Sequence, residues 1–238
     1  MSTLVLRLAA PMQSWGDSSR FTVRQTRREP TKSGIIGLIA AAQGRRRSDS
    51  IEDLLKLKLA VRVDQPGSLL RDFHTARNAS GESMPLTYRY YLSDAVFVVA
   101  VEGERDVVEG IAESLRRPRH PLYLGRRSCP PSAPLVLKIV ELPALAALKS
   151  DEVPWQAAEW FKQQSEENGY TAELAFDLDE DSEREPGVTS DVVQDSPVTF
   201  DQRHRQYTWR SVGRTQLIMH SGLSKLTTHD PMNALEGV

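Results

Sequence analysis

Two adjacent arginines stand in a short loop that contains a glycine and ends in two prolines. The loop is Tyr123-Leu124-Gly125-Arg126-Arg127-Ser128-Cys129-Pro130-Pro131. Glycine lets a backbone approach a ligand closely, and the planar guanidinium group of arginine donates paired hydrogen bonds to phosphate. Bare N–H groups beside Arg126 and Arg127 therefore suit a polyanion. An ordinary exposed turn can have the same composition, so the rest of the chain must distinguish these interpretations.

Basic and aromatic side chains also alternate at three other places. Guanidinium groups bind phosphates and stack on bases, while aromatic faces accept unstacked bases. Burial in the core would explain Phe73, Tyr90 or Tyr91 individually, but three such clusters together favour RNA binding. The clusters are Trp15, Arg20, Phe21 and Arg24; Arg71, Phe73, His74 and Arg77; and Tyr88, Arg89, Tyr90 and Tyr91.

One of these clusters also contains the side chains that metal-independent RNA cleavage needs. A histidine such as His74 can deprotonate a 2′-hydroxyl while Arg89 stabilises the phosphorane, with Tyr88 nearby. Stacking on a base or simple packing explains His74 more economically, so binding is the preferred interpretation and catalysis the weaker one.

Motifs for other chemistries are missing from the sequence. The chain has no GxxxxGK[ST], GxGxxG, HExxH or GxSxG motif, and its five histidines are scattered. Cys129 is the single cysteine, which excludes an internal disulfide and a multi-cysteine zinc site. The acidic run 177–185 lacks the spacing of a calcium loop and is expected to be a solvated loop. We therefore expect neither a metal nor a cofactor.

The charge of the chain is unevenly distributed. The net charge is only −2, but residues 1–138 hold 22 Lys and Arg against 14 Asp and Glu, a net of +8. Residues 139–238 hold 8 against 18, a net of −10. This asymmetry indicates that one half meets a polyanion and the other does not.

The overall composition is that of an ordinary globular protein of 238 residues, with 39% hydrophobic and 26% charged residues. No apolar run approaches the ~20 residues that span a bilayer, and the N-terminus does not resemble a signal peptide. With a lone cysteine, these features predict a cytoplasmic protein that binds no membrane.

Hydrophobic periodicity predicts a β-α-β, hairpin, β-α-β order over roughly residues 1–140. This is the ferredoxin-like (RRM-like) α+β pattern, βαββαβ with both helices on one face, with a hairpin inserted at 70–92. Many RNA-recognition domains share the pattern, which raises the expectation of RNA binding by analogy. The segments are strand 3–9, helix 34–43, a short helix near 50–53, strand 57–63, hairpin 69–92, strand 95–101, helix 107–115 and strand 135–140.

The remainder predicts a smaller, acidic C-terminal β-rich region over 141–214. It contains a helix at 155–168, a short strand at 171–176, and closing strands at 198–200 and 206–209. From about Thr215 no period is clear, so 215–238 is expected to be a mobile tail.

Several separated motifs resemble the CasD subunits of type I-E CRISPR Cascade complexes, which belong to the CRISPR-associated RAMP superfamily. The resemblance is good over about 1–140 and thinner around Asp195-Ser196-Pro197 and 205–212. Five motifs occur in the family's order, which makes the resemblance specific. They are Leu6-Arg7-Leu8-Ala9-Ala10-Pro11-Met12-Gln13-Ser14-Trp15-Gly16, Pro30-Thr31-Lys32-Ser33-Gly34-Ile35-Ile36-Gly37-Leu38, Leu70-Arg71-Asp72-Phe73-His74-Thr75, Tyr88-Arg89-Tyr90-Tyr91-Leu92-Ser93-Asp94-Ala95 and Tyr123-Leu124-Gly125-Arg126-Arg127-Ser128-Cys129-Pro130.

The resemblance implies a non-catalytic RNA-binding subunit that functions in antiviral defence. Its ferredoxin-like domain would hold the 5′ handle of CRISPR RNA, and its hairpin would be a thumb that kinks the RNA, with Arg89 near the bend. Its partners would be the backbone and large subunits, and target DNA through the assembled complex. The candidate RNA-binding residues are Gln13, Trp15, Arg24, Lys32, Ser33, Arg71, His74, Arg77, Arg89, Gly125, Arg126, Arg127 and Ser128.

Two alternatives stay open from the sequence. A related branch in type I-C systems cleaves the precursor RNA itself, so a metal-independent endoribonuclease that processes repeat RNA is the second interpretation. A scaffold whose acidic half binds a basic protein is the third, and its binding would be insensitive to salt.

Overall fold

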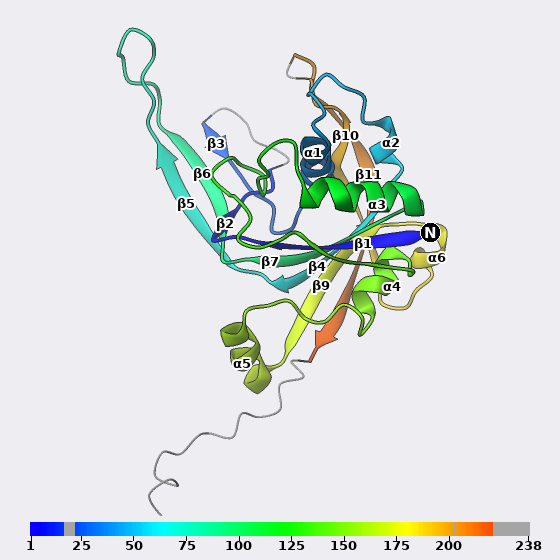
Figure 1. Cartoon of the computed structure of the whole chain (residues 1–238). Coiled ribbons are helices and arrows are strands. Elements are labelled where there is room, and N and C mark those ends of the chain that lie inside the picture. Colours follow the sequence, from blue (N-terminus) through cyan, green and yellow to red (C-terminus); the bar gives the residue numbers. More distant parts are fainter. Residues whose placement is uncertain (17–21, 202, 221–238) are drawn as a thin grey trace, which may run out of the picture.

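A seven-stranded sheet forms the centre of the molecule, in the order β10-β11-β9-β4-β7-β1-β8 (Figure 1). The computed structural model describes residues 1–16, 22–201 and 203–220. Neighbouring strands of this sheet are all antiparallel, which makes the fold a mixed α+β architecture. The strands are β1 (Ser2–Ala9), β4 (Lys58–Gln65), β7 (Val96–Gly103), β8 (Val136–Val140), β9 (Tyr170–Asp177), β10 (Thr189–Thr199) and β11 (Gln206–Met219).

Helices cover the two faces of the sheet unequally. On one face α1 (Lys32–Gln43) and α3 (Arg105–Arg116) bury the main core, to which β1 contributes Leu4, Leu6 and Leu8. On the other face Val5 packs with the residues of α4 (Ala144–Lys149). This two-sided burial follows from the period of two along a strand. The remaining helices are α2 (Glu52–Leu55), α5 (Glu159–Asn168) and α6 (Glu180–Glu183).

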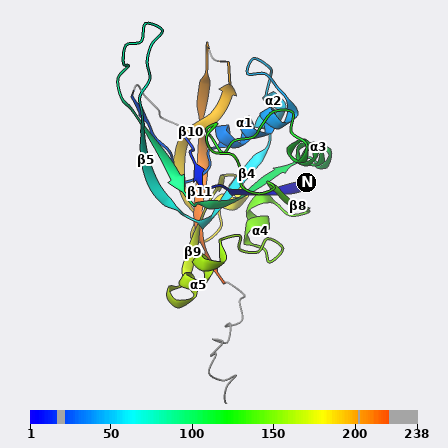
Figure 2. The ribbon, with the colours of Figure 1, turned by 60° about the vertical axis from the view of Figure 1, so that its left-hand side comes forward.

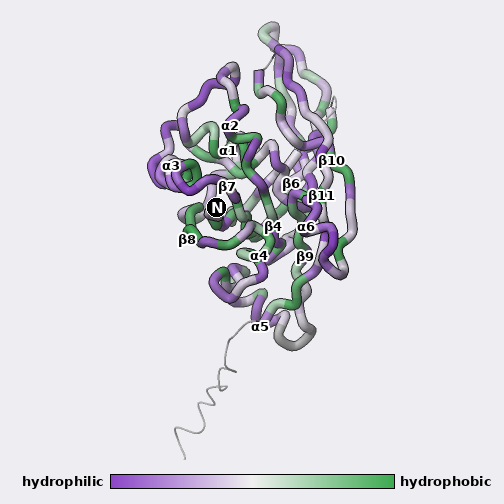
Figure 3. Tube along the Cα trace, turned by 90° about the vertical axis from the view of Figure 1, so that its right-hand side faces the viewer, coloured by the Kyte–Doolittle hydropathy of each residue, from purple (hydrophilic) through white to green (hydrophobic). Residues whose placement is uncertain are grey.

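Hydropathy along the chain agrees with this layering. Figure 3 shows the apolar stretches of β4 and β7 in the interior and hydrophilic stretches of α3 on the outside. In α3 the buried residues Val108, Ile111, Ala112 and Leu115 recur at helical spacing, so one face of the helix covers the sheet.

Helix α1 begins and ends at residues that suit those positions. Thr31, in an extended conformation, accepts a hydrogen bond from the Gly34 N–H through its hydroxyl at 3.2 Å. Gly44 ends the helix in the left-handed region, with φ of 79°. A Cβ on Gly34 would lie 2.8 Å from Cε3 of Trp15, so the buried indole packs directly on the helix backbone.

A second, smaller sheet carries a long hairpin. Its strands β5 (Ser68–His74) and β6 (Thr87–Ser93) pair antiparallel over their whole length, in the range where the sequence predicts a hairpin. At its base β6 also pairs with β2 (Met12–Gln13) and β3 (Val23–Arg24). In Figure 1 the hairpin extends to the upper left, away from the other strands, and in Figure 2 its tip stands at the upper edge of the molecule.

The C-terminal strands are longer than the sequence predicts. β9 pairs with β4, so the C-terminal part continues the main sheet. β11 runs to Met219 in register with β9, and Thr215 lies opposite Leu174. The predicted start of a tail at Thr215 is therefore too early, because pairing with β9 extends the strand despite its weak alternation of polar and apolar residues. Residues 221–238 lie outside the described part of the chain.

The acidic run 177–185 is more ordered than the solvated loop that the sequence predicts. Asp179 caps α6 by accepting from the Ser182 N–H at 3.0 Å, and its carboxylate lies 2.7 Å from Nζ of Lys58. The hydrogen bond from Lys58 holds the pKa of Asp179 far below its usual range.

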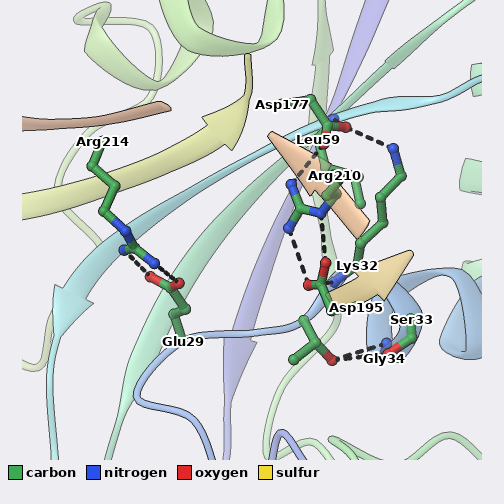
Figure 4. A network of polar contacts seen from close by, with 10 residues as sticks. Glu29, Lys32, Ser33, Gly34, Leu59, Asp177, Asp195, Arg210 and Arg214 are labelled. Carbon is green, nitrogen blue, oxygen red and sulfur yellow. Dashed lines mark hydrogen bonds and ion pairs between the residues drawn. The ribbon is translucent and has the colours of Figure 1, made fainter. Parts of the chain in front are cut away.

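An ionic network joins the start of α1 to the C-terminal strands (Figure 4). Asp195 of β10 accepts from the backbone N–H of Lys32 at 2.8 Å, and Nζ of Lys32 lies 2.8 Å from Asp177 of β9. Arg210 of β11 bridges both carboxylates, at 2.6 Å each. Burial lowers the pKa of Arg210, but Asp195 and Asp177 outweigh that effect and raise it. Strand and helix are thus joined by paired charges, of which Lys32 and Asp195 are buried and Arg210 and Asp177 partly buried.

A second buried ion pair holds the chain on the opposite face of the sheet. Arg62 and Asp64 of β4 are 1% and 0% exposed and lie 2.6 Å apart. Arg62 also donates to the carbonyl oxygens of Val153 and Pro154, at 3.0 and 3.1 Å, which fixes the segment before α5. Burial raises the pKa of Asp64 despite the adjacent guanidinium group.

No helix in the part of the chain that the structure describes is long and apolar enough to cross a bilayer.

We predict that Asp195→Ala lowers the free energy of unfolding by about 3 kcal/mol. The substitution removes the anion that pairs with Arg210 and with the first turn of α1. Denaturant unfolding measures the loss. Asp191→Ala is the matched control, because Asp191 is 49% exposed and lies 3.4 Å from Arg214; its cost should stay below about 1 kcal/mol. Equal losses in the two variants would contradict a structural role for the network.

Candidate functional site

An open cleft of about 580 Å³ lies over α1, between the segment 120–127 and the end of the β10–β11 hairpin. Its volume is that of a site for a small-molecule-sized group such as a nucleotide. The basic and aromatic side chains that line it are Trp15, Arg45, Arg46, Arg47, His120, Tyr123, Arg127, Phe200, Arg205 and Tyr207.

The charge of this cleft has one sign. Among the described residues that line it there are five arginines and no Asp or Glu. Arg45 forms an ion pair with Asp53, and this hydrogen bond raises its pKa. The others, Arg46, Arg47, Arg127 and Arg205, are exposed, and none forms an ion pair with a carboxylate of the described chain. Unpaired guanidinium groups around a hollow favour a ligand with several negative charges.

The start of α1 forms part of the cleft wall, and two of its N–H groups have acceptors within the protein. Thr31 accepts from the N–H of Gly34 and Asp195 from that of Lys32. The Lys32 side chain is buried in the ionic network, whereas Ser33 lines the cleft with its hydroxyl 3.3 Å from that of Thr31. The exposed arginines are therefore the main donors that the described residues present to the cleft.

Gly125 makes a close contact within the protein, which differs from the role that the sequence suggests. Its φ is 91°, and a Cβ there would lie 1.7 Å from the carbonyl oxygen of Ser14. The Ser14 N–H donates to the carbonyl of Leu124 at 3.1 Å. The glycine is needed because the loop backbone packs against the segment that carries Trp15.

The two arginines of the loop have different surroundings. Arg126 stacks over the Tyr91 ring at 4.6 Å and donates to the carbonyls of Tyr90 and Arg24, at 3.1 and 2.9 Å. It therefore fastens the loop to the base of the hairpin. Arg127 is exposed and lines the cleft. Ser128 lies beside this contact, 3.5 Å from the Tyr91 hydroxyl.

Gln13 and Trp15 lie in the segment against which the loop packs. Gln13 is fully buried and donates through Nε2 to the carbonyls of Leu8 and Ala95. Its Oε1 accepts from the indole N–H of Trp15 at 3.2 Å. Both side chains are thus engaged inside the protein, although part of Trp15 borders the cleft.

Three of the other predicted residues lie on the β5–β6 hairpin. Arg71 lies over the Tyr88 ring at 5.3 Å, and Arg77 is exposed at the tip. Nε2 of His74 lies 2.7 Å from Oδ2 of Asp72.

The base of the hairpin carries the last two predicted residues. Arg24 of β3 stands opposite Arg89 of β6. The buried Nε of Arg89 has no hydrogen-bond partner among the described residues.

Arg20 and Phe21 lie outside the described residues. The predicted residues thus fall into a cleft group and a hairpin group, with Arg126 between them.

The cleft also contains residues that the sequence did not single out. Arg46 and Arg47 follow the glycine that ends α1, and a run of three arginines there was a usable signal. His120 had no comparable signal. Arg205 and Tyr207 lie in the acidic half, where the charge balance pointed away from a polyanion site.

Comparison with known proteins gives the class to which this architecture belongs. A family model described as CRISPR-associated protein (Cas_Cas5) matches residues 3–213. The chain therefore belongs to this family of CRISPR-associated proteins.

Comparison with individual proteins shows which members of the family the chain resembles. The chain is 38% identical over 157 residues to the CRISPR system Cascade subunit CasD of Escherichia coli (strain K12), which covers 57% of this chain and 70% of that protein. One chain of a solved CRISPR RNA-guided surveillance complex matches with a TM-score of 0.72 at 34% identity, over 98% of each chain. A crystal structure of a Cas protein matches with a TM-score of 0.66 at 35% identity, over 92% of this chain and 95% of that one. Within its family this chain is CasD-like.

We predict that Cys129 of the loop reacts very slowly with iodoacetamide in the native protein. The thiol is 1% exposed, and burial raises its pKa, so the reactive thiolate is scarce even near pH 8. Mass spectrometry of the labelled chain measures the rate, with denatured protein as the fully reactive control. Native labelling as fast as in the denatured chain would show that the loop does not pack as described.

Proposed function

We propose that this chain is a Cascade subunit that binds the 5′ handle of CRISPR RNA. The observation that carries the proposal is the cleft, where Arg46, Arg47, Arg127 and Arg205 present unpaired guanidinium groups. Single-stranded RNA supplies both phosphates for such groups and bases for the neighbouring aromatic rings. The CasD-like sequence and the match to a surveillance complex support CRISPR RNA as the class of RNA.

The topology supports this proposal. Strands β8-β1-β7-β4 with α1 and α3 on one face have the order of a ferredoxin-like domain, on which many RNA-recognition modules are built. The β5–β6 hairpin is inserted between β4 and β7 and would be the thumb that bends the RNA at the end of the handle. Arg89, with its buried and unpartnered Nε, lies near the base of this thumb.

The proposed partners follow from the same relationship. In the cytoplasm the subunit would connect the repeated backbone subunits to the large subunit of the complex and so contribute to antiviral defence. Target DNA would be recognised by pairing with the guide RNA and not by this chain. The role proposed here is therefore to hold one end of the guide RNA in a fixed position.

We predict that Arg127→Ala weakens binding of a single-stranded RNA with the handle sequence and lowers the salt dependence. Losing one phosphate contact should reduce the slope of log K against log salt by about 0.7. Fluorescence anisotropy of the purified full chain at several salt concentrations measures both. Arg117→Ala is the matched control, since Arg117 is exposed directly after α3, pairs with Glu113 and does not line the cleft. If Arg127→Ala leaves the salt slope unchanged, the cleft is not part of the RNA-binding surface.

We propose further that the subunit binds RNA without cleaving it. His74, the base that the sequence suggests, lies beside the carboxylate of Asp72 on an exposed hairpin, away from the cleft. The competing function, a metal-independent endoribonuclease, would need His74 to accept the proton of a 2′-hydroxyl.

We predict that full-length repeat RNA stays intact during long incubation with the purified protein in a metal chelator. The length of the RNA is measured on a denaturing gel, with a metal-independent ribonuclease as the positive control. Cleavage that His74→Ala abolishes would establish the endoribonuclease instead.

A further inference from the structure

One wall of the cleft, opposite the segment 120–127, is formed by the end of the β10–β11 hairpin. This hairpin belongs to the acidic C-terminal half of the sequence. Phe200 follows β10, and Arg205 and Tyr207 stand at the start of β11. Figure 1 shows this end of β10 beside α1 and α2, far from the β5–β6 hairpin. The cleft is therefore built from both halves of the chain.

This wall is held against α1 at two points. Phe200 packs at Gly37, where a Cβ would lie 3.6 Å from Cζ of the ring. Further along β10, Asp195 accepts from the backbone N–H of Lys32. The β10–β11 hairpin is consequently fixed relative to α1, so the residues near its end keep a defined position.

The chemistry of this wall is unlike that of its surroundings. Residues 139–238 carry a net charge of −10, yet Arg203, His204 and Arg205 follow one another at the turn. Arg205 is exposed, lines the cleft and forms no ion pair with a carboxylate of the described chain. Tyr207 is half-buried and lines the same hollow, so its ring is positioned but still accessible.

We propose that the end of the β10–β11 hairpin is a second half of the RNA-binding site. Arg205 binds a phosphate and Tyr207 stacks on a base of single-stranded RNA, while Arg127 holds another phosphate from the opposite side of the cleft. The inference rests on the proposed function and adds to it a part of the site on the C-terminal strands. Arginine and an aromatic face together are a common platform for unpaired nucleotides.

The test uses the full-length protein and a single-stranded RNA with the handle sequence. Tyr207→Ala should weaken binding about tenfold, the loss typical of one stacked base, whereas Tyr207→Phe should bind like the unmodified protein. Arg205→Ala should weaken binding and reduce the salt slope by about 0.7. Arg203→Ala is the matched control, because Arg203 is exposed at the same turn but does not line the cleft; its affinity should stay within about twofold of the unmodified protein's.

The outcomes separate this inference from the proposed function. If Arg205→Ala and Tyr207→Ala bind normally while Arg127→Ala binds weakly, the second half of the site is excluded and RNA binding stands. If Arg203→Ala costs as much as Arg205→Ala, diffuse charge explains the effect and the inference fails. If none of these variants, including Arg127→Ala, alters binding, the proposed function itself fails. Thermal unfolding of each variant shows that the fold is intact.

Discussion

The position of the C-terminal strands against α1 depends on one interaction, the ionic network in which Asp195 and Asp177 hold Arg210 and the start of α1. Helix α1 lies under the cleft, and the strands that carry these carboxylates lead to the wall opposite the segment 120–127. Paired charges are directional, unlike apolar contacts, so the network sets the position of strands and helix as well as joining them. Further contacts join the C-terminal strands to the rest of the chain, among them the pairing of β9 with β4, the ion pair of Arg214 with Glu29, and the packing of Phe200 at α1.

Residues of the loop 123–131 that the sequence groups together have different roles in the structure. Gly125 and Arg126 serve contacts within the protein, with Ser14 and with the base of the hairpin respectively. Of the two adjacent arginines, Arg127 is the one that lines the cleft. Adjacent residues of one type can therefore have separate roles, one in fixing the loop and the other in meeting a ligand.

Sequence reasoning was most successful where contacts are local or strictly periodic. The alternation of Leu4, Leu6 and Leu8 predicts β1, and the spacing of Val108 and Ile111 predicts α3. The length of strand β11 was underestimated, because pairing with β9 sets this length and the alternation of polar and apolar residues in β11 does not. The cleft residues Arg205 and Tyr207 could not be found either, since their placement depends on contacts between distant parts of the chain. The pairing of Lys32 could not be predicted, because nothing near it in the sequence reveals the carboxylates of Asp177 and Asp195.

The separation of these partners along the chain has a consequence for synthesis of the protein. Asp195 stands 163 residues after Lys32, and Asp177 stands 145 residues after it. During translation the first half emerges with its positive charges and no carboxylates to complete the network, because contacts of such long range form only when the late strands appear. The complete cleft therefore forms only after β10 and β11 have been synthesised, because these strands carry one of its two walls.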